Sequence, residues 1–198
     1  MSTLPDRLAR LLRPAAFAAL VGAALFAASQ LSAVRAHAAP RSSGDSAGDV
    51  APAFTHTRPQ DWLNSAPLEL AKLRGNVVLL DVWTTDCWNC YRSFPWLHEI
   101  KHRYAVQGVR IVGVLSPEFE REKDPVRIRA RLAEYGVEQP VMLDSDYSYW
   151  NALGNRFWPA FYLIDKQGRI RVRLVGEQHA GDPSARKFED QLKALSAE

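Results

Sequence analysis

One stretch near the middle of the chain constrains the fold more than any other. The seven residues Val77 to Trp83 are apolar and mostly β-branched apart from Asp81, which is typical of a strand buried on both faces of a sheet. Beyond Cys87 and Cys90, apolar residues recur at every third position, as on one face of a helix. The sequence therefore predicts an α/β protein in which two cysteines lie where a buried strand passes into a helix.

This location determines what the cysteines can do. The unpaired amides and the dipole at a helix N-terminus stabilise a thiolate and lower the pKa of a cysteine there. Cys87 is the candidate nucleophile, and Cys90, one turn further on, is the candidate thiol that resolves a mixed disulfide. The chain has no other cysteine, and closing so short a loop stabilises a fold little. We predict a redox-active dithiol rather than a structural cross-link.

The residues around the two cysteines resemble those of the thioredoxin superfamily, in particular its TlpA-like branch and the thioredoxin-like domain of DipZ-type proteins. The matching positions, in chain order, are Asp81, Trp83, Cys87, Cys90, Pro95, Gly113–Phe119, Asp144–Asp146 and Trp158–Ala160. The resemblance implies a thioredoxin-like α/β fold, in which a central mixed β-sheet carries helices on both faces. It also implies the central βα insertion that distinguishes TlpA-like and peroxiredoxin-like proteins from minimal thioredoxin.

The same resemblance implies roles for single residues. Asp81, on the strand beneath the cysteines, would accept or deliver the proton of Cys90, and burial would suit it by raising its pKa. The Trp158–Pro159 bond would be cis and face the disulfide, which leaves a backbone edge for an extended substrate segment. The expected supporting residues around the cysteines are Trp83, Trp88, Asn89, Trp158, Pro159 and Glu118.

Some positions around the cysteines leave alternatives open or depart from the family pattern. Glu118 follows a second predicted central strand and is either an acid or base behind the site or a solvated loop carboxylate. Trp88–Asn89 replaces the dipeptides of better-known relatives, and because these residues help to set the redox potential, the direction of electron transfer stays open. Ser93 is neutral where some TlpA-like reductases carry a glutamate, which removes one expected proton carrier.

The N-terminal residues predict export. Three arginines precede an apolar run from Pro14 to Phe26, and Ala36-His37-Ala38 forms a small-x-small cleavage site. We interpret residues 1–38 as a secretory signal peptide; the alternative is an uncleaved anchor, because Pro14 to Val34 could span a bilayer of about 30 Å. Either arrangement places the rest of the chain in the periplasm or another extracytoplasmic space.

The remainder divides into two parts. Residues 39–60 are rich in Ala, Pro, Ser, Gly and Asp and predict a flexible linker, and residues 61–198 form the predicted thioredoxin-like domain. Four of the 25 Lys and Arg and one of the 22 Asp and Glu lie in residues 1–38, which leaves 21 of each sign. The remaining chain is formally neutral, so its composition gives no reason to expect binding to nucleic acid.

We therefore predict an exported thiol-disulfide oxidoreductase that reduces protein disulfides and needs no cofactor beyond its Cys87–Cys90 redox pair. Its partners would be protein thiols and disulfides, together with a membrane thiol donor of the DipZ or CcdA type. One alternative is a thiol peroxidase, because Thr84 stands three residues before Cys87, although Leu80 occupies the position where that motif has proline.

A second alternative is a copper-binding or other metal-binding module of the Sco type, in which Cys87, Cys90 and a remote histidine would hold the ion. His98 and His102 lie further along the predicted helix, on a face that does not return easily to the thiols. The acidic pair Asp144 and Asp146 lacks further ligands in the sequence, and such pairs are more often helix caps and turn formers than metal sites. We predict no metal site.

Overall fold

A computed structural model describes residues 48–198. The predicted signal peptide or anchor over residues 1–38 and the first part of the predicted linker lie outside this range. Within it, no helix is both long and apolar enough to cross a membrane. The strands are β1 (Asp49–Val50), β2 (Trp62–Leu63), β3 (Val77–Trp83), β4 (Val109–Leu115), β5 (Val141–Leu143), β6 (Ala160–Ile164) and β7 (Arg169–Val175).

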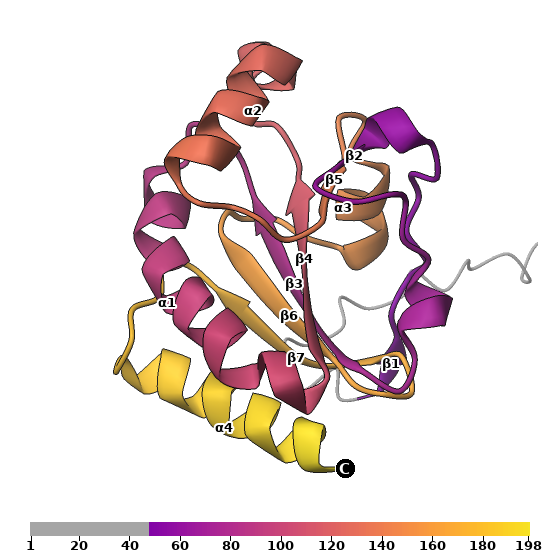
Figure 1. The fold of residues 1–198 in the computed structure, drawn as a ribbon, viewed down its shortest axis with the longest axis vertical. Coiled ribbons are helices and arrows are strands. Elements are labelled where there is room, and N and C mark those ends of the chain that lie inside the picture. Colours follow the sequence, from indigo (N-terminus) through magenta and orange to yellow (C-terminus); the bar gives the residue numbers. More distant parts are fainter. Residues whose placement is uncertain (1–47) are drawn as a thin grey trace, which may run out of the picture. The chain divides into compact units, whose positions relative to one another are not determined.

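These strands form one mixed sheet with the order β1-β7-β6-β3-β4-β5-β2 (Figure 1). β3 lies at its centre, where it pairs in parallel with β4 and antiparallel with β6. Its position agrees with its sequence, since a strand with neighbours on both edges and covered on both faces must be apolar along its whole length. The predicted central mixed sheet is confirmed.

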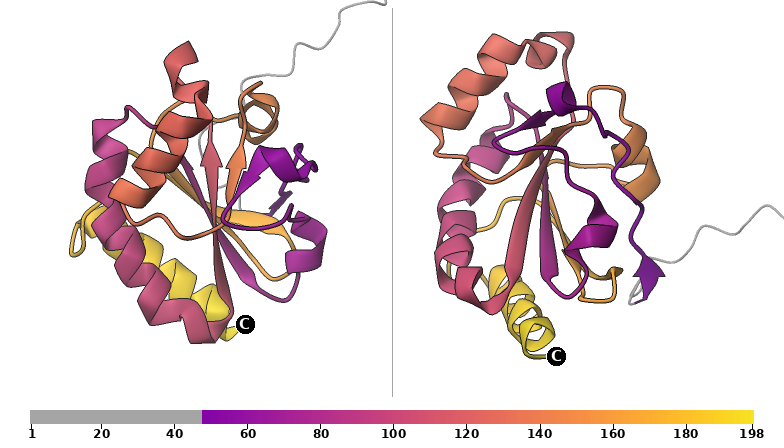
Figure 2. Two further views of the ribbon diagram at one scale, coloured as in Figure 1. Left: turned by 45° about the horizontal axis from the view of Figure 1, so that its top comes forward. Right: turned by 45° about the vertical axis from the view of Figure 1, so that its right-hand side comes forward.

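Helices cover both faces of this sheet, as predicted (Figures 1 and 2). The α-helices are α1 (Trp88–Tyr104), α2 (Pro125–Glu134), α3 (Ser148–Leu153) and α4 (Pro183–Ala197). Short 3₁₀ turns are η1 (Pro59–Asp61), η2 (Leu70–Leu73), η3 (Ala105–Gln107) and η4 (Glu120–Lys123). α1 and α4 lie on one face, and α3 lies with the N-terminal segment on the other. From β3 onward, strands and helices follow in the predicted order, with α2 and β5 forming the expected insertion.

The alternation of side chains along β3 divides the core into two layers. Leu79 and Trp83 belong to the apolar cluster under α1 and α4, whereas Leu80 and Val82 belong to the cluster under α3. Because successive residues of a strand point to opposite faces, Asp81 falls on the α1 side together with Leu79 and Trp83. The strand register thus places the one charged side chain of β3 beneath the helix that carries the cysteines.

The structure corrects the prediction of a flexible linker over residues 39–60 for the part of it that is described. β1 pairs with β7 at the edge of the sheet, and Ala51 and Phe54 are buried in the cluster under α3. The ring of Phe54 lies 5.3 Å from that of Tyr149 and 5.4 Å from that of Trp62, between ring centroids. The composition of the segment did not predict this packing, because a few buried apolar residues are enough to hold a segment that has no periodic pattern. Residues 48–60 belong to the domain.

This packing gives a stability prediction. Phe54→Ala should lower the free energy of unfolding by about 3 kcal/mol, because it removes a buried aromatic ring and leaves a cavity. The matched control is Val50→Ala in the same segment, whose side chain is 64% exposed and whose loss should cost less than about 0.5 kcal/mol. Urea unfolding of both variants measures the difference. Equal midpoints for the two variants would show that the buried ring of Phe54 contributes no more to stability than the exposed side chain of Val50.

Candidate active site

The two cysteines differ in exposure, as their places at the start of α1 require. Cys87 is the N-cap of α1 and is half-buried, whereas Cys90 lies within the first turn and is 1% exposed. They form a disulfide with a Cα–Cα distance of 5.2 Å, and the backbone N–H of Cys90 donates to the Cys87 sulfur over 3.1 Å. Of the two sulfur atoms, only that of Cys87 is accessible to an external thiol or disulfide.

Asp81 lies buried on the same side of β3 as α1 and is 1% exposed. Burial raises its pKa from 3.8 to about 8, because a charged carboxyl is costly away from water. Within the described residues its Oδ2 atom has no hydrogen-bond partner. The same holds for two side-chain atoms of residues that follow it closely in the chain, Trp83 Nε1 and Thr84 Oγ1. A protonated carboxyl that titrates near neutral pH can exchange a proton with a thiol.

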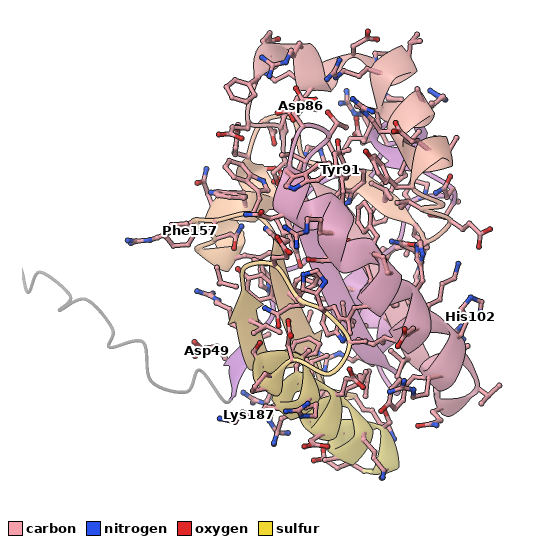
Figure 3. All side chains as sticks on the ribbon, turned by 90° about the vertical axis from the view of Figure 1, so that its left-hand side faces the viewer. Asp49, Asp86, Tyr91, His102, Phe157 and Lys187 are labelled. Carbon is pink, nitrogen blue, oxygen red and sulfur yellow. A yellow bond between two sulfur atoms is a disulfide. The ribbon has the colours of Figure 1, made fainter. Side chains whose placement is uncertain are left out.

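Cys87 opens onto a depression of about 360 Å³. Its lining residues are Asp86, Cys87, Trp88, Asn89, Glu118, Arg156, Phe157 and Trp158. Figure 3 shows Asp86 and Tyr91 near one end of α1 and Phe157 on a neighbouring segment, whereas His102 lies at the other end of the helix. Three segments far apart in sequence therefore meet around the exposed sulfur, and we call this hollow the Cys87 depression.

Aromatic side chains form much of the rim of the Cys87 depression. Trp88 is 67% exposed and Phe157 is 60% exposed, and both line the depression. Trp158 is fixed instead, because its Nε1 donates to the Ser116 carbonyl over 3.0 Å and its ring lies 4.4 Å from that of Trp150. The rim thus combines one rigid and two free aromatic surfaces.

The remaining predicted positions fall around the same centre. The Trp158–Pro159 bond is cis, as the resemblance implied, and the Pro159 carbonyl accepts from the Gly176 N–H of the segment after β7. Trp83 is fully buried and meets the ring of Phe94 edge to face. Asn89 and Glu118 are exposed at the rim. Glu118 therefore lies beside the opening of Cys87 and not behind it.

Ser93 takes a structural role in the first half of α1. Its hydroxyl donates to the Asn89 carbonyl over 2.8 Å and accepts from the backbone N–H of Gln178 over 3.0 Å. The first of these hydrogen bonds needs a donor, which a hydroxyl supplies and an ionised carboxyl does not. Ser93 thus ties α1 to the segment after β7, at the position where some TlpA-like reductases carry a glutamate.

Two acidic residues next to Cys87 were missed by the sequence analysis. Asp86 precedes Cys87 and forms ion pairs with Arg121, over 2.7 Å, and with Arg127. Burial acts to raise the pKa of Asp86, but hydrogen bonds and charge from these two arginines outweigh it and lower the pKa. Glu122 is fully buried and accepts the backbone N–H of Asp86 over 2.7 Å. Its carboxylate also accepts the backbone N–H of Phe119, the residue before the turn, but phenylalanine at that position gives no capping signal in the sequence.

The acidic pair Asp144 and Asp146 acts mainly as caps. Asp144 accepts the backbone N–H groups of Tyr149 and Trp150 at the start of α3, each over 2.9 Å, and Asp146 accepts that of Ser148. His56 joins the pair, with its Nε2 3.3 Å from Asp144 and 3.2 Å from Asp146. Among residues 48–198, these three are the one set of acidic, histidine or cysteine side chains whose ligand atoms converge, and neither cysteine belongs to it.

Comparison with known proteins identifies close relatives. The Redoxin family model matches residues 46–192. Protein DipZ of Mycobacterium tuberculosis is 40% identical over 119 residues, which cover 59% of this chain and 17% of DipZ. Thiol-disulfide oxidoreductase YkuV of Bacillus subtilis is 30% identical over 115 residues, which cover 58% of this chain and 77% of YkuV. The chain thus spans a small part of DipZ and most of YkuV.

Solved structures agree with this. A crystal structure of a candidate thiol:disulfide interchange protein DsbE from Chlorobium tepidum superposes with a TM-score of 0.64 at 26% identity, covering 76% of this chain and 97% of that one. The solution structure of a thioredoxin-like protein in its oxidised form superposes with a TM-score of 0.62 at 27% identity, covering 76% and 96%. The thioredoxin-like fold is confirmed by both.

Proposed function

Because the chain belongs to the Redoxin family and is a thioredoxin-like thiol-disulfide oxidoreductase, we propose that it reduces protein disulfides outside the cytoplasm through its Cys-Trp-Asn-Cys motif. The observation that carries the proposal is the arrangement at the start of α1. An exposed sulfur at Cys87 is joined to a buried sulfur at Cys90, and the buried carboxyl of Asp81 lies on the same side of the sheet.

The reaction follows from these positions. In the reduced protein the Cys87 thiolate attacks one sulfur of a substrate disulfide, a mixed disulfide forms, and the other substrate sulfur leaves with the bond's electron pair and takes a proton. The ionised form of Asp81, which is populated because its pKa lies near 8, then accepts the proton of Cys90, and the Cys90 sulfur attacks that of Cys87. The bond between Cys87 and the substrate breaks, and the second substrate sulfur leaves with its electron pair and takes a proton from Asp81 or from solvent. The protein ends as the Cys87–Cys90 disulfide, and the substrate has gained two electrons and two protons.

Electrostatics near Cys87 favour the reducing direction. A strong oxidant needs its reduced form to be stabilised, usually by groups that favour the thiolate. Here the acids Asp86 and Glu118 line the same depression as Cys87, and Glu122 lies behind Asp86. Arg156 lines the depression too, and Arg121 and Arg127 pair with Asp86. These charges nearly balance, so beyond the helix N-terminus no excess of positive charge favours the thiolate. The reduced dithiol therefore gives up its electrons more readily than that of a strong oxidant.

A reductant of this kind must be recharged. We propose that a membrane thiol donor of the DipZ or CcdA type reduces the Cys87–Cys90 disulfide. We also propose that residues 1–38 direct the export of the domain to the side of the membrane on which this donor is active. The similarity of this chain to part of Protein DipZ is the observation behind this choice of donor. Cell fractionation with antibody detection tests the location: an extracytoplasmic protein is expected, and recovery of the whole protein from the cytoplasm contradicts the proposal.

The equilibrium potential of the Cys87/Cys90 pair tests the direction. We expect a value near −270 mV, about that of thioredoxin, from thiol trapping of the purified protein across a series of redox buffers. The physical reason is that no excess of positive charge around Cys87 stabilises its thiolate. A potential near −120 mV, about that of strong periplasmic oxidants, would make the protein a disulfide donor instead.

A peroxidase is the second candidate, and the structure gives it no support. Leu80, where the peroxidase motif has proline, is fully buried in the cluster under α3. The metal-binding alternative fares no better, because within the described residues no histidine or acid joins the two cysteines in a convergent set.

A further inference from the structure

The carboxylate of Glu122 holds together two loops that are separate in sequence. Its Oε1 accepts the backbone N–H of Asp86 over 2.7 Å, and its Oε2 accepts those of Glu118 and Phe119 over 2.5 and 2.7 Å. Asp86 belongs to the turn before Cys87, whereas Glu118 and Phe119 belong to the loop after β4. The side chain is fully buried, and three N–H donors around one buried group need an acceptor without protons, that is, a carboxylate.

These two loops form neighbouring parts of the wall of the Cys87 depression. Asp86 and Glu118 both line it, and Glu122 lies behind both parts as their common anchor. The beginning of the second loop has other supports, because Tyr147 donates to the Pro117 carbonyl and Trp158 to that of Ser116. Glu118 and Phe119 are exposed, and their backbone depends on Glu122 for the hydrogen bonds that fix them.

An outer contact repeats the connection at the surface. The Arg121 guanidinium lies 4.2 Å from the centroid of the Phe119 ring and forms an ion pair with Asp86 over 2.7 Å. Arg121 therefore spans the same two loops on the solvent side, and Glu122 spans them on the buried side. Two independent ties between the same segments indicate that their separation is set closely.

From this arrangement we infer that Glu122 is a positioning residue for the substrate, which keeps the Glu118–Phe119 wall of the Cys87 depression in place and so determines affinity for polypeptide disulfides. It takes no part in the exchange between sulfur atoms. The inference rests on the proposed function, because it needs the depression to receive a polypeptide that carries a disulfide. A small disulfide, which reaches Cys87 without touching the wall, should not depend on Glu122.

The test compares two probes that undergo the same reaction. One is a short peptide whose central cysteine is joined in a disulfide to nitrothiobenzoate, and the other is N-acetylcysteine amide joined to the same aryl thiol. The reduced Cys87 thiolate bonds to the cysteine sulfur, the bond to the aryl sulfur breaks, and nitrothiobenzoate leaves as a coloured thiolate. Rates across a range of probe concentrations separate the half-saturating concentration from the limiting rate.

Glu122→Gln keeps the size of the side chain but replaces one of its two acceptor oxygens by an NH₂ group. That group cannot accept a hydrogen bond from a backbone N–H, so one of the two loops loses its tie to residue 122. We expect the half-saturating peptide concentration to rise about tenfold, while the limiting rate and the rate with the small probe stay within about twofold. Glu120→Gln is the matched control, because it removes the same charge from an exposed position on the same turn. It should leave both probes unaffected.

Arg121→Gln keeps the test independent of folding, because Arg121 is 58% exposed and its loss removes only the outer tie. It should raise the half-saturating peptide concentration about threefold and leave the small probe unchanged. An equal loss with both probes in these variants, or no loss with either, would overturn the role of Glu122. Failure of the wild-type protein to react with the peptide at all would instead refute the proposed function, and the inference with it.

Discussion

Cys87→Ser will abolish disulfide exchange, with a loss of more than about a thousandfold. A serine hydroxyl forms no disulfide, and Cys90, which is 1% exposed, cannot attack a substrate in its place. Reduction of a disulfide-linked test peptide by the pre-reduced protein measures the loss, and thermal unfolding shows that the variant is folded.

Cys90→Ser is the matched control for this prediction, because it changes the same atom one turn along the helix. It should keep the first step and lose the second, so that a stable mixed disulfide between Cys87 and the substrate accumulates. Mass spectrometry of the unreduced reaction mixture detects this adduct. An adduct on Cys90 in the Cys87→Ser variant would contradict the assignment of the two roles.

Asp81→Asn is expected to slow resolution of the mixed disulfide by about a hundredfold, because it removes the group that takes the proton of Cys90. The effect should fall on the second step and leave the attack by Cys87 unchanged. Stopped-flow release of the second substrate thiol measures it. Equal rates of resolution in the variant and the wild type would leave Asp81 as a buried acid without a part in the reaction.

The same substitution should stabilise the protein, and the pH range of the gain follows from the pKa of Asp81, which rises from 3.8 to about 8 on folding. Between these values the folded protein holds a proton that the unfolded chain has lost, so wild-type stability falls as the pH rises from about 4 and levels off above about 8. Asp81→Asn removes this fall. We expect the variant to be more stable by roughly 4 kcal/mol at pH 7, with the gain vanishing near pH 4.

Denaturant unfolding of the oxidised protein at a series of pH values measures this gain. Asp86→Asn is the comparison at an ion-paired carboxylate, because arginine partners lower the pKa of Asp86 and its replacement should lower the free energy of unfolding above about pH 4. A stability difference between Asp81→Asn and the wild type that does not vary with pH would show that Asp81 does not titrate in this range.

Much of the fold and the centre of the site were available from the sequence. The apolar run Val77 to Trp83, with its single aspartate, defines a central strand because only a strand buried on both faces needs such a composition. Cys87 and Cys90 follow it at the helix start, where local backbone geometry alone decides which thiol is the N-cap. Pro159, directly before a buried strand, likewise indicated from local sequence, through the resemblance to the family, that the Trp158–Pro159 bond is cis. Each of these inferences depends on residues close together in the chain.

The errors and omissions share one physical cause. Residues 48–60 carry no periodic pattern, and their place in the domain depends on Phe54 meeting Tyr149, a contact between distant segments. Glu122 resembles any acidic residue of a charged turn, and only the packing of two loops around it leaves its carboxylate buried. The sequence by itself determined the strand, the helix and the order of the two sulfurs. Tertiary structure alone decided which polar groups lost water and what replaced it, because burial and hydrogen-bond partners are set by contacts across the fold.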